Sequence, residues 1–248
     1  MKKLIYLFSI SFVMILLTSC FKDLDNWYTE TAGYDGRYAV AVTCEEYDDD
    51  NLTIEDGEEL MIYNSAANVA NEIIIDTHIA DGYAIKGKFN VSGSPADFRG
   101  TAESPNVIYS SAISNANNYY FIYNGNYYLP SQFGAPDELG EEYEGIQLYS
   151  RLTLESGRIT SLGATTIGGN KSDGLDIKIT AYTDEFIVES YQTPQDTWAD
   201  INEPELAWRI KAGTRMNADG WEEHWTFNGY RYTGYPEDIG ATVPVIVN

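Results

Sequence analysis

From residue 36 onward, apolar and polar residues alternate in short runs and do not show the spacing of a long amphipathic helix. A period of two is typical of strands that bury one face, and the close spacing of the runs predicts consecutive antiparallel strands. The predicted strands cover residues 36–44, 60–63, 72–79, 83–91, 97–101, 146–154, 158–167, 175–182, 186–191 and 221–233. Residues 193–215 contain two prolines and scattered acids, and are predicted to form an excursion with at most one short helix.

The strongest local signal is a hairpin at residues 118–130. Asn124 and Gly125 suit the two positive-φ positions of a type I′ turn, and strand-forming residues flank them. The two-residue loop pairs Phe121 with Tyr128 and puts an aromatic surface on both faces of the hairpin. One face holds Tyr120, Ile122, Tyr127 and Leu129, and the other holds Tyr119, Phe121, Tyr123 and Tyr128. Only one face is needed for a core, so the other is open to two interpretations, mutual packing or stacking on a ligand.

About ten strands without intervening helices favour an all-β fold. A closed antiparallel barrel of about 8–10 strands is the economical solution, because closure pairs every strand edge that would otherwise promote aggregation. Residues 34–248 are long enough for one such domain.

The first twenty residues have the pattern of a secretory signal peptide. Lys2 and Lys3 precede an apolar run at residues 4–17, which is too short to span a bilayer comfortably. The run ends in Leu-Thr-Ser-Cys, which resembles a bacterial lipobox. We therefore expect a signal peptide at residues 1–19 and acyl chains, such as palmitate, on Cys20.

Residues 20–33 are predicted to be the lipidated cysteine and a tether. Within them, residues 22–25 (KDLD) resemble the export signal that sends lipoproteins to the outer face of the outer membrane in Bacteroidetes. An ordinary polar linker is the alternative. We expect an outer-membrane protein anchored by lipid, with its periplasmic or surface orientation left open.

The formal charge of −23 limits the partners of this chain. A surface this acidic repels phosphate backbones, and we therefore expect no nucleic-acid partner. No later segment is apolar enough to span a bilayer, which leaves the acyl chains to hold the membrane. Lipidation of Cys20 leaves Cys44 without a partner for a disulfide, and its alternation with apolar neighbours predicts a small buried side chain.

The sequence offers little catalytic chemistry. His78 and His224 are the only histidines, and no Gly-x-Ser-x-Gly motif accompanies them. Glu222 and Glu223 are adjacent on a predicted strand and therefore point to opposite faces. The acidic loop that begins at residue 48 departs from the calcium-loop pattern. No catalytic residue, metal site or cofactor is predicted, and a non-enzymatic function is favoured while an enzyme stays open.

Three stretches together resemble one family. They are residues 61–68 (MIYNSAAN), 170–177 (NKSDGLDI) and 229–235 (GYRYTGY). The chain is similar to the Bacteroidetes lipoproteins called the lipid-binding putative hydrolase family. The resemblance implies a lipocalin-like (calycin-type) barrel, a lipid anchor and an apolar or amphiphilic ligand. It supplies no catalytic motif, and the aromatic hairpin and residues 184–220 are elaborations on the family's core.

One end of the barrel gives a geometric prediction. Gly36 and Tyr38 fall where lipocalin-like barrels commonly carry Gly-x-Trp on the first strand. Arg231 lies on the last strand, which meets the first when a barrel closes, so we expect its guanidinium within about 6 Å of the Tyr38 ring.

The favoured function is binding of a lipid or other amphiphilic small molecule in the barrel or its mouth. The candidate ligand-binding residues are Tyr38, Tyr119, Phe121, Tyr123, Tyr128, Trp221, Trp225 and Arg231. The first alternative is a surface glycan-binding or accessory protein, for which Tyr119, Phe121, Tyr123 or Tyr128 would form an exposed row. The second is a hydrolase with two carboxyl groups that face each other across a cleft. The oligomeric state and the ligand stay open.

Overall fold

The computed structural model describes residues 29–46, 58–79, 83–107, 119–166, 168–200 and 202–235. The predicted signal peptide, Cys20, the KDLD segment and most of the acidic loop lie outside these residues. The strands are β1 (Gly36–Cys44), β2 (Glu58–Asn64), β3 (Glu72–Ile79), β4 (Tyr83–Ser94), β5 (Asp97–Gly100), β6 (Ser104–Pro105), β7 (Tyr120–Tyr123), β8 (Asn126–Tyr128), β9 (Glu142–Thr165), β10 (Lys171–Gln192), β11 (Leu206–Ile210) and β12 (Met216–Arg231). Two short helical turns accompany them, α2 (Pro130–Phe133) and the 3-10 turn η4 (Gln195–Thr197).

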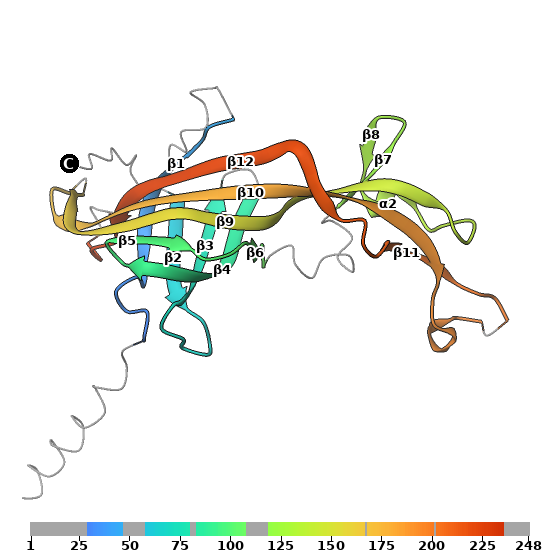
Figure 1. Ribbon diagram of the computed structural model, residues 1–248, viewed down its shortest axis with the longest axis horizontal. Coiled ribbons are helices and arrows are strands. Elements are labelled where there is room, and N and C mark those ends of the chain that lie inside the picture. The colour runs from blue at the N-terminus through green and yellow to red at the C-terminus, as the bar shows by residue number, and fades with distance from the viewer. Residues whose placement is uncertain are drawn as a thin grey trace, which may run out of the picture.

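The antiparallel sheet closes into a ring. Its hydrogen-bonded order is β9-β10-β12-β1-β2-β3-β4-β5, and β5 pairs back to β9. Figure 1 shows the ring on the left, with β9, β10 and β12 crossing the view and continuing to the right. The predicted all-β class is confirmed, and first and last strands meet as expected, because β1 pairs with β12.

The inward faces of all eight ring strands supply one apolar core. Alternate residues along each strand are buried there, as the period of two requires. Its largest fully buried side chains include Trp225, Tyr38, Phe89, Phe98 and Phe227. Among the described residues, the inside of the ring is therefore occupied by packed aromatic and aliphatic side chains.

Two predicted strand breaks are wrong, because β9 and β10 are each one long strand. The gap between the predicted strands 146–154 and 158–167 instead holds a bulge: Ile179 pairs with Leu154 while Lys178 pairs with Ser156, which leaves Glu155 as an extra residue. Gly157 stays in the ladder. A Cβ there would lie 2.2 Å from the Phe98 ring, so this glycine makes room for a core side chain and not for a chain reversal.

Beyond the ring, β9 and β10 carry a second apolar cluster, which we call the distal lobe. It consists of β7, β8, α2, β11 and the parts of β9 and β10 that pair with β7 and β11. Its buried residues are Tyr119, Phe121, Phe186 and Val188. The short helix α2 and the strand β11, which falls in the predicted excursion, were both missed from the sequence.

The ring passes into the distal lobe at a level where three strands are irregular. Around Thr183 of β10, both β9 and β12 carry extra residues, and Tyr149 of β9 adopts φ +48°. Asp184 is fully buried at this level, with Arg151 at 3.0 Å and Arg215 at 2.9 Å from its two oxygens. We call this level the neck.

Candidate functional site

At one end of the ring, Arg231 lies over Tyr38 as predicted. The guanidinium carbon is 5.4 Å from the ring centroid, and one guanidinium nitrogen donates to the Tyr38 hydroxyl at 2.9 Å. Asp173 holds the same guanidinium at 3.2 Å. Burial raises the pKa of Tyr38, although Arg231 opposes this shift. The geometric prediction is confirmed, while a ligand-binding role for these two side chains stays a prediction.

At the opposite end of the ring, Trp225 packs inside the core. The Tyr149 ring meets it edge-on at 6.5 Å, and the Tyr149 hydroxyl donates to Glu223 at 2.5 Å. Glu222 on the other strand face is exposed, so the two adjacent glutamates do point to opposite faces. They do not form a pair across a cleft.

The hairpin β7–β8 has the predicted register and turn. Phe121 pairs with Tyr128, and Asn124 and Gly125 have φ values of 51° and 73°. The face with Tyr119 and Phe121 forms the core of the distal lobe, where Phe133 stacks on Phe121 at 4.2 Å. Tyr119 and Phe121 are buried, so the exposed row that the glycan-binding alternative requires is limited to Tyr123 and the half-buried Tyr128.

The opposite face of the hairpin lines a cavity of about 180 Å³, which we call the ring-end cavity. Its wall consists entirely of apolar and aromatic residues, namely Tyr120, Tyr127, Ile146, Leu148 and Trp221. Leu148 also packs against the ring core, so the cavity adjoins the end of the ring where Trp225 lies. Tyr127 and Trp221 are about half exposed, with ring centroids 6.4 Å apart. The cavity therefore offers apolar surface that water still reaches.

A larger cavity of about 390 Å³, the outer cavity, lies on the same sheet face. Tyr120 pairs with Ile146 in the first cavity, and two residues further along Ile122 pairs with Glu144 in the second, so the two cavities are neighbours. The outer cavity is lined by Ile122, Glu144, Gly145, Glu185, Phe186, Ile187, Gly213, Thr214 and Met216.

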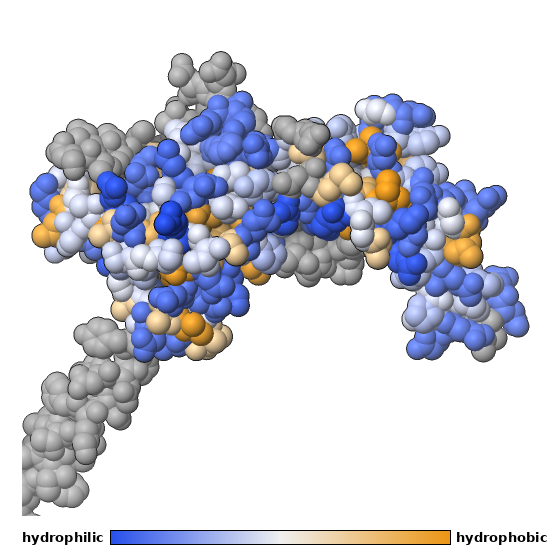
Figure 2. Space-filling view, in the orientation of Figure 1, coloured by the Kyte–Doolittle hydropathy of each residue, from blue (hydrophilic) through white to orange (hydrophobic). Residues whose placement is uncertain are grey.

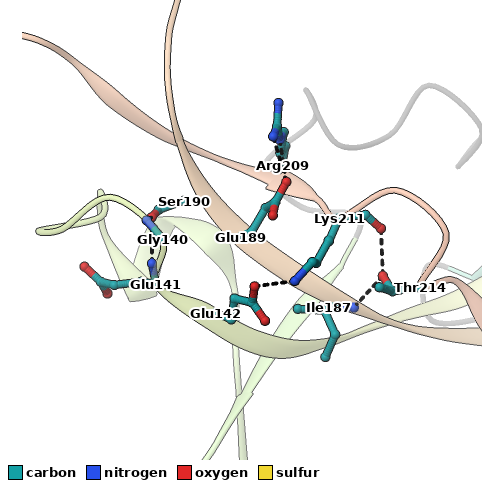
Figure 3. Close-up of polar contacts among 9 residues, drawn as sticks. All are labelled: Gly140, Glu141, Glu142, Ile187, Glu189, Ser190, Arg209, Lys211 and Thr214. Atoms are coloured by element: carbon teal, nitrogen blue, oxygen red, sulfur yellow. Dashed lines mark hydrogen bonds and ion pairs between the residues drawn. The ribbon is translucent and has the colours of Figure 1, made fainter.

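Hydrogen bonds fix the rim of the outer cavity. Thr214 accepts from the Ile187 amide at 3.0 Å and donates to the Lys211 carbonyl at 2.7 Å, and Lys211 is paired with Glu142 (Figure 3). On the next part of β10, Ser190 accepts from the amides of Gly140 and Glu141. These contacts tie β10 to the segment just before β9 and to the loop that follows β11.

The surface of the protein is mainly polar on the face drawn in Figure 2. Figure 2 shows mostly hydrophilic residues, with some apolar residues where Figure 1 labels β7, β8 and α2 and others scattered over the rest of this face. Within the described ranges, no helix is long and apolar enough to cross a membrane, and no three potential metal ligands gather in one place.

Cys44 and His224 do not form a nucleophilic pair. Cys44 is buried as predicted, burial raises its pKa to about 12, and its Sγ donates to Glu46 at 3.2 Å. Glu46 also holds the ring of His224, with 2.5 Å between Oε1 and Nδ1. At neutral pH the sulfur therefore carries its proton and is a poor nucleophile.

Of the residues that line the ring-end cavity, only Trp221 was among the ligand-binding residues predicted from the sequence. Tyr120 and Tyr127 were placed correctly on one hairpin face, yet the face chosen for a ligand was the one that became core. Ile146 and Leu148 could not be assigned to a cavity from spacing alone, because the bulge at Tyr149 decides which way their neighbours point.

A family model described as "Lipid-binding putative hydrolase" matches residues 23–236, which include both cavities and the whole ring. No curated protein matches the chain.

Proposed function

Since the chain belongs to the lipid-binding putative hydrolase family, we propose that it binds a lipid or another amphiphile, with the apolar part of the ligand in the ring-end cavity. The observation that carries the proposal is the wall of this cavity, in which Tyr120, Tyr127, Ile146, Leu148 and Trp221 all present apolar surface. Each 100 Å² of apolar surface removed from water contributes about 2.5 kcal/mol.

The sequence predicts a ligand in the barrel or at its mouth, and the described cavities favour a position outside the packed interior. The inward faces of the ring are packed with buried side chains such as Trp225 and Phe227. The described cavities lie on the sheet face beyond the ring, where Leu148 links the ring core to the ring-end cavity. A ligand there extends the apolar core outward and needs no rearrangement of the ring.

The proposal includes the membrane anchor. Acyl chains on Cys20 hold the protein at the outer membrane, and the strongly acidic folded domain stays in the aqueous phase beside it. The segment at residues 22–25 would then decide between the cell surface and the periplasm. Such an arrangement keeps a lipid-binding site close to the membrane without insertion of the folded domain.

A binding titration tests the site. The whole mature chain, residues 20–248 with Cys20→Ala, is mixed with N-phenyl-1-naphthylamine, an uncharged probe that fluoresces in apolar surroundings. We expect saturable fluorescence, with an affinity about tenfold weaker in Trp221→Ala, because that substitution removes one of the three aromatic side chains of the wall.

The matched control is Trp198→Ala. Trp198 lies in the 193–200 loop, contacts the Thr193 carbonyl and lines neither cavity. Its loss should leave the titration unchanged. Equal weakening by both substitutions, or no saturable binding in the parent chain, would overturn the proposed site. Fluorescence unchanged by Trp221→Ala, combined with binding of a soluble oligosaccharide, would favour the glycan-binding alternative.

A further inference from the structure

The outer cavity differs from the ring-end cavity in its charge. Glu144 of β9 and Glu185 of β10 both lie on its wall and are exposed to solvent. Ile187 pairs with Glu144 and Ile146 pairs with Glu185, which places the two carboxylates at diagonal positions on one sheet face. The remainder of the wall is mainly apolar, with Ile122, Ile187 and Met216 among its residues.

The arginine and lysine side chains of the segments next to this cavity form ion pairs with other carboxylates. Arg209 binds Glu189 at 2.8 Å, and Arg215 binds Asp184 at 2.9 Å. Lys211 is paired with Glu142. Within the described part of the chain, no ion pair engages Glu144 or Glu185. The cavity wall therefore carries two carboxylates, and the ion pairs of Arg209, Lys211 and Arg215 all go to other acids.

We propose that the natural ligand is a cationic amphiphile, whose positively charged head lies in the outer cavity against Glu144 and Glu185 while its tail fills the ring-end cavity. This inference rests on the proposed binding function and adds the chemical class of the ligand. The orientation follows from polarity, because the wall of the ring-end cavity is wholly apolar and the acids belong to its neighbour.

Electrostatics outside the cavity favours the same class. The chain carries a formal charge of −23, so its field attracts cations and repels anions before contact. A fatty-acid or bile-acid carboxylate would meet that field and then two further carboxylates. An ammonium or guanidinium head would meet complementary charge at both stages, at the entrance and at the wall.

Three probes with the same tail separate the possibilities. Dodecyltrimethylammonium, dodecyl maltoside and dodecanoate are titrated below their micellar concentrations into the whole mature chain with Cys20→Ala, by isothermal titration calorimetry. We expect the cationic probe to bind about tenfold more tightly than the neutral one, which corresponds to about 1.4 kcal/mol. The preference should shrink as NaCl is raised, because the two carboxylates are exposed to solvent.

The decisive variant is Glu144→Gln with Glu185→Gln, which should remove the preference while neutral binding persists. The control, Glu30→Gln with Glu203→Gln, neutralises the same number of exposed charges. Glu30 and Glu203 lie outside both cavities, and each donates a hydrogen bond only through its backbone. The control variant should therefore keep the preference for the cationic probe. Circular dichroism confirms that each variant is folded.

The outcomes distinguish the two proposals. If the neutral probe binds and the cationic probe binds no better, the charge inference is wrong and the binding function stands. If the preference for the cationic probe survives in the cavity variant, or disappears equally in the control, that preference comes from the overall charge of the protein and not from Glu144 and Glu185. If none of the three probes binds, the proposed function itself fails.

Discussion

Gly157 shows how one missing side chain supports the ring core. A Cβ at this position would lie 2.2 to 2.8 Å from three atoms of the Phe98 ring, and Phe98 is itself buried and packed edge-on against Tyr34. We expect Gly157→Ala to lower the free energy of unfolding by about 1–3 kcal/mol through overpacking. Urea unfolding followed by tryptophan fluorescence measures the change.

The control for this prediction is Gly174→Ala on the neighbouring strand β10. There the nearest atom to a new Cβ is 3.6 Å away, which is ordinary van der Waals contact, and the backbone has no positive φ. Its stability should stay close to that of the parent chain or rise slightly. Equal losses in both variants would mean that glycine is needed for backbone freedom and not for the Phe98 ring.

His224 and Glu46 make a second residue-scale prediction, a dependence of stability on pH. The hydrogen bond that the His224 ring donates to the Glu46 carboxylate raises the pKa of His224 above its ordinary value of 6.5. Burial alone would raise the pKa of Glu46, but the hydrogen bonds from His224 outweigh it and lower that pKa to about 2. The histidine contribution is complete below pH 6.5 and is lost as the pH rises through the raised pKa, whereas the glutamate contribution is complete above about pH 4.5.

We therefore expect the thermal unfolding temperature to fall modestly as the pH rises above 6.5, because both side chains are substantially exposed. Differential scanning calorimetry from pH 5 upward measures this slope. His224→Gln and Glu46→Gln should each flatten it, since either change removes the same pair. A slope that persists in both variants would assign the effect to other groups.

At the scale of elements, the neck depends on Asp184. This carboxylate is fully buried on β10 and binds Arg151 of β9 and Arg215, which lies just before β12. Asp184→Asn removes the charge that both guanidinium groups share, and should cost on the order of 1–3 kcal/mol. We expect faster amide hydrogen exchange at the neck and in the distal lobe than in the ring core.

Glu189→Gln is the matched change on the same strand, because it also breaks a carboxylate–arginine contact, but at an exposed site with Arg209. It should change stability by less than about 1 kcal/mol and leave exchange at the neck unaltered. Uniformly faster exchange throughout the ring of Asp184→Asn would contradict a role confined to the neck.

Elements with local causes could be predicted from the sequence, and elements decided by distant partners could not. The β7–β8 hairpin has its predicted register because Asn124 and Gly125 determine the turn within a few residues. The continuity of β9 depends on Phe98, which lies far from Gly157 in sequence. The same limit applies to the site: the pattern gave two aromatic faces, and only the packing of Phe133 and Trp208 decided which one became core.

On the scale of the whole molecule, the ring and the distal lobe form two apolar clusters joined by two long strands. The ring holds the larger apolar core, and the cavities lie where the ring ends and the distal lobe begins. A ligand bound there contacts β7, β9, β10 and β12 at once. We therefore expect a bound amphiphile to protect amides of the distal lobe from hydrogen exchange more than amides of the ring.

The membrane anchor gives the last prediction. Because the folded domain is strongly acidic, attachment should depend on the acyl chains at Cys20. In cells fed an alkyne analogue of palmitate, the parent chain should carry the label and sediment with membranes, whereas Cys20→Ala should lose the label and leave the membrane fraction. Cys44→Ala is the control, since this second cysteine is buried in the ring and its thiol has a raised pKa. Label retained by Cys20→Ala would disprove lipidation at Cys20, and membrane association without label would mean that another segment holds the protein.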